Sequence, residues 1–371
     1  MFIFIAVGGN LLSSTEMASV VVAQSISLVC VLFCSCFTTQ YLLLRYKEQG
    51  HFFWLKLFFF FVLITVCVIV LWFKSILILS LFVVGIVSEF IKRYCYYADQ
   101  ALLSFCAMLC TVISFMSMII LAWGGAISLH TDNYIFFYSM AKFLPLMIVL
   151  GFLAFKRNIN PCFSLKSSEG FSNVIQESLK LGGVFSIITI IYWMTNQGFF
   201  IIFQNEIPAT ELVNLRVTQN VFGIVTMLIT LYDSIFLKNN INNTKKIFSL
   251  RGYLNFSLVA LGLIVINFVI AYVFSKTLYM HIDIFKYSLY FALAQLCYLL
   301  ARMPILILKL RYNLLFILAL YIASLFISLG YLFLNKSDTD YQYIVQSTAL
   351  ANFLVLFFSL IIVFKKEVKY G

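Results

Sequence analysis

Long apolar runs alternate with short polar breaks along the whole chain, and this pattern predicts the secondary structure. The runs are continuously apolar, whereas the strands of a membrane barrel are apolar at every second position. Roughly 20 such residues are enough for a helix to cross the hydrocarbon core of a bilayer. The predicted spans are 2–12, 18–37, 57–73, 75–91, 102–124, 134–155, 181–203, 217–237, 254–275, 287–308, 314–334 and 344–364. We therefore expect an all-α integral membrane protein with about 12 transmembrane helices.

The first run, 2–12, is much shorter than a typical span. It has neither a basic start nor a small-residue cleavage site, which disfavours a cleaved signal peptide. We interpret it as a shortened first transmembrane helix.

Composition supports lipid as the solvent of this chain. Of 371 residues, 63% are hydrophobic and 11% are charged, whereas soluble domains carry about 25% charged residues. The mean hydropathy is +1.03. A water-soluble core would not hide this much apolar surface.

Lys and Arg are concentrated in every second gap between the runs, which predicts the orientation. These gaps hold 19 of the 25 Lys and Arg residues. Because basic loops stay in the cytoplasm, we expect a multi-pass protein of the bacterial cytoplasmic (inner) membrane with both termini inside. Topology also accounts for most of the net charge of +11. Nucleic acid is not an expected partner, since the cations are scattered over short loops.

The longest polar interruption, 156–180, divides the runs into two sets of six. We expect two six-helix bundles, 1–155 and 181–371, joined by a cytoplasmic linker, with a short amphipathic helix at 171–179. The alternative is an ordinary long loop without an internal division.

Three cations stand inside or beside apolar runs, where a charge is costly and often functional. Lys142 lies within 134–155, and it either reaches the outer surface or faces a hydrated, anion-binding cavity. Arg216 is either an ordinary interfacial residue or part of a polar stripe. Arg302 precedes Pro304, and it is either a cytoplasmic-side residue or a phosphate ligand near a kinked helix.

Other polar residues extend these candidate sites. Gln219 and Asn220 lie three and four residues after Arg216, which places all three on one helical face. Asn196 and Gln197 lie in mid-run and predict either helix-to-helix hydrogen bonding or the lining of a cavity. Glu89 and Asp233 end apolar runs, and each is either an interfacial group or a site for a coupling proton or cation.

Motifs for catalysis are lacking in the sequence. It contains no P-loop, no set of residues arranged for nucleophilic catalysis and no paired cysteine–histidine pattern of a metal site. Most of its nine cysteines lie within the apolar runs. We expect a protein that is not an enzyme and that needs no metal or other cofactor.

Several segments resemble bacterial O-antigen and polysaccharide flippases of the MOP (MATE-like) superfamily. Gly182-Gly183-Val184 begins the seventh span, and Asn196 and Gln197 occupy its polar position. The stretch 211–220 is similar to a degenerate motif of the family through Arg216 and Gln219, with Asn214 in place of a small residue. The stretch 88–94 resembles the end of the fourth helix in that family.

The resemblance implies a transporter that flips undecaprenyl-pyrophosphate-linked oligosaccharide repeat units outward by alternating access. The expected pyrophosphate and sugar contacts are Lys142, Arg216, Arg302, Gln219, Asn220 and Asn196. Membrane lipid surrounds the protein, and the resemblance implies a polysaccharide polymerase and a chain-length regulator as candidate protein partners.

Two alternatives stay open. A small-molecule exporter of the same superfamily would need acidic residues deep in its first bundle. A membrane-embedded polysaccharide polymerase or ligase usually carries a long outer loop, whereas the outer gaps here are short.

Overall fold

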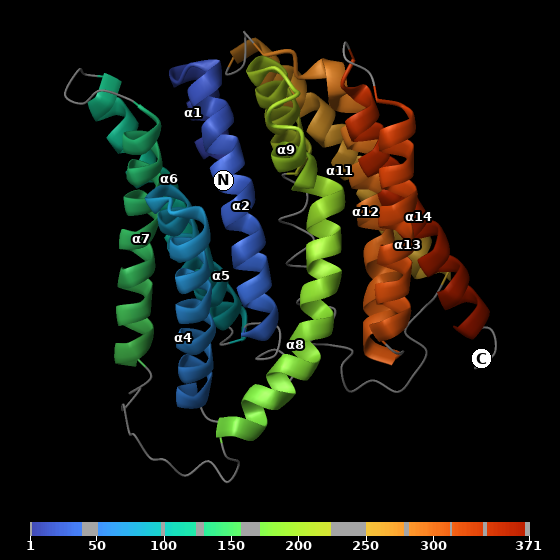
Figure 1. Ribbon diagram of the computed structural model, residues 1–371, viewed down its shortest axis with the longest axis horizontal. Helices are drawn as coiled ribbons and strands as arrows, with labels where there is room; N and C mark the ends of the chain where they lie inside the picture. The colour runs from blue at the N-terminus through green and yellow to red at the C-terminus, as the bar shows by residue number, and fades with distance from the viewer. Residues whose placement is uncertain are drawn as a thin grey trace. The chain divides into compact units, whose positions relative to one another are not determined.

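The computed structural model describes residues 2–38, 51–97, 101–123, 130–156, 171–223, 250–277, 282–311, 314–336 and 340–367. All regular structure in these residues is helical (Figure 1). The helices are α1 (Phe2–Leu11), α2 (Ser14–Phe37), α4 (His51–Val68), η1 (Ile69–Phe73), α5 (Ile76–Tyr97), α6 (Ala101–Trp123), α7 (Thr131–Lys156), α8 (Phe171–Trp193), η2 (Met194–Gly198), α9 (Phe199–Ile202), a helix at 209–223, α11 (Leu250–Thr277), α12 (Phe285–Arg311), α13 (Leu314–Leu334) and α14 (Gln342–Glu367).

Within the described residues, 6 helical segments are long and apolar enough to cross a membrane. They are Ser14–Phe37, Ser178–Ile202, Leu250–Thr277, Phe285–Leu308, Leu314–Leu334 and Gln342–Lys365. The predicted all-α, multi-pass character is thereby confirmed. The count of twelve spans and the side on which the termini lie stay predictions.

Several helix boundaries differ from those expected, among them the starts of α2 and α8. Helix α2 begins at Ser14, before the predicted start, because Ser13 and Glu16 cap it reciprocally. The Ser13 hydroxyl donates to Glu16 Oε2 at 2.7 Å, and the Glu16 N–H donates to Ser13 Oγ at 3.3 Å. The short helix expected at 171–179 is continuous with the following span, so α8 starts at Phe171.

The chain forms two compact units. The first contains Met1–Ala18 and Ile191–Gly371, and the second contains Ser19–Ile190. The two predicted six-helix bundles stay a prediction, and most of the predicted linker lies outside the described residues.

In the second unit, α5, α6 and α7 pack together around a small apolar core. Ile91, Cys95, Ala107, Leu146 and Val149 form this core and are almost fully buried. Such burial fixes the helices against one another by close packing.

Helices α2 and α8 approach closely within the same unit. A Cβ atom at Gly182 would lie 2.6 Å from Cδ1 of Phe37, so the contact requires glycine. The Ser178 hydroxyl also donates to the Phe37 carbonyl at 2.7 Å. Small residues at such crossings let two membrane helices pack backbone to backbone.

In the first unit, α14 packs along α12 and also contacts α13. These three helices run side by side in orange and red in Figure 1. The helix at 209–223 joins this unit through Asn267 of α11, whose Nδ2 donates to the Phe222 carbonyl at 3.1 Å. The unit thus places the 209–223 helix, η2 and α14 around one polar cluster.

Candidate functional site

A π-helix interrupts the span Ser178–Ile202 at Met194–Gly198. Two side chains of this region bond back to one carbonyl: Thr195 Oγ1 and Asn196 Nδ2 both donate to the Tyr192 carbonyl at 2.9 Å. Such local bonds compete with the regular helical ladder. π-helical turns occur often at functional sites, because they expose backbone groups to other partners.

Several side chains from other helices bind this π-helix. Gln219 Nε2 donates to the Asn196 carbonyl at 2.6 Å, and Thr348 Oγ1 donates to the Thr195 carbonyl at 3.0 Å. Asn352 Nδ2 donates to Asn196 Oδ1 at 3.1 Å. The 209–223 helix and α14 therefore hold the π-helix between them, and the polar groups are satisfied inside an apolar bundle.

Arg216 lies at the centre of this cluster, and only 1% of its surface is exposed. Its Nη1 donates to Gln219 Oε1 at 2.7 Å and to Gln197 Oε1 at 3.0 Å. The guanidinium carbon lies 5.1 Å from the centroid of the Phe200 ring. The structure thus places this arginine in the interior of the first unit, which differs from the interpretation of Arg216 as an ordinary interfacial residue.

The surroundings of Arg216 suit the binding of an anion. The amide oxygens of Gln197 and Gln219 orient the guanidinium but carry no charge of their own. A guanidinium has a planar fork of donors that matches phosphate oxygens in pairs. Burial strengthens such contacts, because the local dielectric is low.

The predicted polar stripe is assembled only in part. Gln219 contacts Arg216 directly, and Asn196 is connected to Arg216 through the Gln219 amide. Asn220 instead donates to the Arg216 carbonyl of its own helix at 3.0 Å. A spacing of four residues lets this amide reach back along the helix, so its contact is local.

Arg302 reaches the cluster through aromatic rings. Its guanidinium carbon lies 4.5 Å from the centroid of Tyr298, and the Tyr298 ring stacks on Tyr192 at 5.2 Å between centroids. Tyr192 is also the residue whose carbonyl accepts the Thr195 and Asn196 bonds. Arg302 is therefore linked through two rings to the residue that precedes the π-helix by two positions.

Of the remaining predicted residues, Lys142 and Glu89 belong to the second compact unit, whereas the cluster belongs to the first. Lys142 belongs to the second unit, where its ammonium lies 5.6 Å from the centroid of Tyr138 and its side chain is half-buried. Glu89 pairs with Lys92 at 3.9 Å. Asp233 lies outside the described residues.

Thr348 and Asn352 were not predicted as site residues, whereas Gln197 was expected either to bond another helix or to line a cavity. The available signal was their polarity within an otherwise apolar run, with Thr348 and Asn352 four residues apart and hence on one helical face. Their partners lie about 150 residues earlier in the chain, which the pattern of a single segment does not reveal.

An ion pair fixes the start of the helix that carries Arg216. Lys286 Nζ lies 2.8 Å from Glu211 Oε1, and the Tyr287 hydroxyl donates to Glu211 Oε2 at 2.6 Å. Burial alone would raise the pKa of Glu211, but the hydrogen bonds from Lys286 and Tyr287 outweigh it and lower the pKa below its ordinary value. This carboxylate stays ionised and anchors the 209–223 helix to α12.

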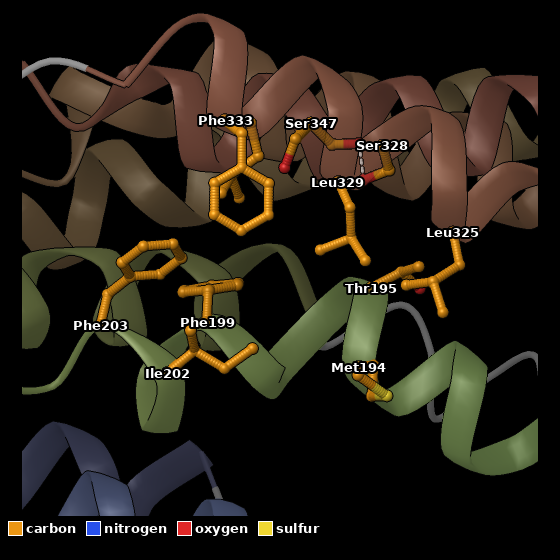
Figure 2. A pocket seen from close by; sticks show the side chains of 11 residues that line it. Met194, Thr195, Phe199, Ile202, Phe203, Leu325, Ser328, Leu329, Phe333 and Ser347 are labelled. Carbon is orange, nitrogen blue, oxygen red and sulfur yellow. Dashed lines mark hydrogen bonds between the residues drawn. The ribbon is translucent and has the colours of Figure 1, made fainter.

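An apolar groove lies on another side of the π-helix. Figure 2 shows side chains from the η2 and α9 segment and from α13 projecting into a common space. Ser328 donates to the Ser347 carbonyl at 3.0 Å at its edge, so these polar atoms are already partnered. Thr195 lines the groove while its carbonyl belongs to the polar cluster.

Comparisons of the chain with protein-family models, with curated proteins and with solved structures find no match. A proposal for the function of this protein therefore rests on the geometry of the polar cluster around Arg216.

Proposed function

We propose that this multi-pass membrane protein flips undecaprenyl-pyrophosphate-linked polysaccharide repeat units across the bacterial cytoplasmic membrane. The observation that carries the proposal is the fully buried Arg216, held by Gln197 and Gln219 inside an apolar bundle. The proposal includes twelve spans in two six-helix bundles that rock to expose the site alternately.

The physical reason concerns the cost of moving the lipid head group. A pyrophosphate carries several negative charges, and hydrocarbon disfavours each of them strongly. A buried guanidinium offsets that cost through paired, charge-assisted hydrogen bonds. The prenyl tail needs no such help, because it stays in the apolar phase.

The other candidate residues have secondary roles in this proposal. Arg302 and Lys142 contact the head group before or after Arg216, while Gln219, Asn196 and Asn220 contact the pyrophosphate or the sugar. Glu89 and Asp233 serve as the coupling carboxylates for a proton or cation. Arg216 is the residue on which the proposal depends most.

Disruption of the gene in its source cell tests the proposal. A lost flippase leaves the cell without surface polysaccharide and with lipid-linked single repeat units on the inner face of the membrane. Return of the intact chain restores both. Unchanged polysaccharide together with altered drug sensitivity would instead indicate a small-molecule exporter, and single repeat units at the cell surface would indicate a lost polymerase.

A further inference from the structure

Gln219 joins Arg216 to the backbone of the π-helix through a single planar amide. Its Oε1 accepts from Arg216 Nη1 at 2.7 Å, and its Nε2 donates to the Asn196 carbonyl at 2.6 Å. The two ends of the amide move together, because the group is rigid. A ligand that displaces Gln219 from Arg216 therefore also disturbs its bond to the π-helix.

Helix α14 holds the same π-helix from a second direction. Thr348 Oγ1 donates to the Thr195 carbonyl at 3.0 Å, and Asn352 Nδ2 donates to Asn196 Oδ1 at 3.1 Å. Both donors lie on one face of α14, four residues apart. Because α14 packs along α12, a shift of the π-helix reaches the body of the unit through these two residues.

An anion at Arg216 competes directly with the two glutamines. Gln197 and Gln219 offer neutral amide oxygens to the guanidinium, whereas a phosphate offers charged ones. Charge-assisted hydrogen bonds are roughly twice as strong as neutral ones. The anion therefore binds more tightly to the state in which the glutamine oxygens have moved away from Arg216 than to the state in which they contact it. This difference in affinity is what a ligand needs to shift the population between two states.

We propose that the π-helix Met194–Gly198 transmits anion binding at Arg216 to α14, with Gln219 as the coupling side chain and Thr348 and Asn352 as positioning residues. The anion takes the guanidinium from Gln219, the Gln219 amide releases the Asn196 carbonyl, and the π-helix loses one of its restraints. This inference rests on the proposed function only in taking a pyrophosphate at Arg216 as the ligand.

Hydrogen exchange of the full chain in phosphatidylcholine nanodiscs, with and without undecaprenyl pyrophosphate, tests the coupling. The ligand is expected to speed exchange in peptides covering 192–200 and 344–352 by roughly two- to tenfold, the effect of losing about one neutral hydrogen bond. In Thr348→Val, the change at 192–200 persists and the change at 344–352 becomes smaller, because Asn352 alone then joins α14 to the π-helix.

Two matched variants control this experiment. Thr348→Ser keeps the hydroxyl and is expected to restore the response at 344–352. Thr111→Val removes a hydroxyl that donates to the Ala107 carbonyl of its own helix at 2.8 Å, and it should leave both responses intact.

The outcomes separate this inference from the proposed function. Ligand binding that depends on Arg216 but leaves exchange unchanged in both segments would overturn the coupling and leave the proposed function standing. Loss of ligand binding in Thr348→Val would also overturn it, since Thr348 would then be needed for the fold of the site. Absence of Arg216-dependent binding in the wild type would contradict the proposed function itself.

Discussion

Arg216 and Lys142 share one sequence signal, a cation within or beside an apolar run, yet their surroundings differ. Arg216 is fully buried and donates to the amide oxygens of Gln219 on its own helix and of Gln197 in the π-helix. Lys142 is half-buried and lies over the ring of Tyr138, one turn away on its own helix. The buried arginine has polar partners that orient its guanidinium, whereas a long flexible amine beside a ring reaches toward water at little cost.

The largest expected effect comes from Arg216→Gln. This change removes the guanidinium, and the outward transport of lipid-linked repeat units is expected to fall roughly tenfold to a hundredfold, the worth of charge-assisted hydrogen bonds to phosphate. Accumulation of lipid-linked single repeat units on the inner face measures the loss. Arg216→Lys, which keeps the charge without the planar fork, should recover only part of the transport.

Asn352→Ala tests whether the polar cluster around Arg216 is also a structural element. The change leaves Asn196 Oδ1 without the donor that lies 3.1 Å away, and we expect the free energy of unfolding to fall by about 1–3 kcal/mol. Denaturant unfolding of the purified protein in detergent measures it. Asn335→Ala is the matched control, since Asn335 is exposed and bonds the Tyr331 carbonyl of its own helix. Equal losses in both variants would show that the cluster adds no special stability.

Glu211→Gln tests how the helix that carries Arg216 is anchored. Because the folded state lowers the pKa of Glu211, the ionised carboxylate stabilises the fold above the ordinary value of 4.5, and this stabilisation is lost as the pH falls below it. We expect the thermal midpoint of the wild type to decrease in that acidic range, and Glu211→Gln to lower the midpoint at neutral pH and flatten its pH dependence. Glu206→Gln should change little, because its pair with Lys336 is largely exposed.

The smallest effect is expected from Lys142→Gln. Transport should stay within about twofold of wild type, since exposed or half-exposed cations contribute little binding energy in water. The same accumulation assay serves as the measurement. A loss equal to that of Arg216→Gln would break the comparison and make Lys142 an equal partner in binding the head group.

Much of the fold could be predicted from hydropathy because lipid imposes long, continuous apolar helices. Each predicted run falls on helical residues where the structure describes it. Helix α2 starts before the predicted residue because Ser13 and Glu16 cap it. The π-helix at Met194–Gly198 could not be predicted from that pattern, and the donors that bind its carbonyls come from helices distant in sequence.

The site was predicted in part. Arg216, Gln219 and Asn196 were selected as polar exceptions in apolar runs, and the structure brings them together. The shared helical face correctly predicted that the Gln219 side chain contacts the Arg216 side chain. It failed for Asn220, whose amide donates to the Arg216 carbonyl of the same helix. Thr348 and Asn352 were missed because their partners are set by tertiary packing.

Binding of two lipids to the purified protein tests the central claim, that Arg216 receives a pyrophosphate, most directly. Undecaprenyl pyrophosphate and uncharged undecaprenol are compared by titration with wild type and Arg216→Gln. We predict that the wild type binds the pyrophosphate lipid at least about tenfold more tightly than undecaprenol, and that Arg216→Gln abolishes this preference. An equal preference in both proteins would contradict the account.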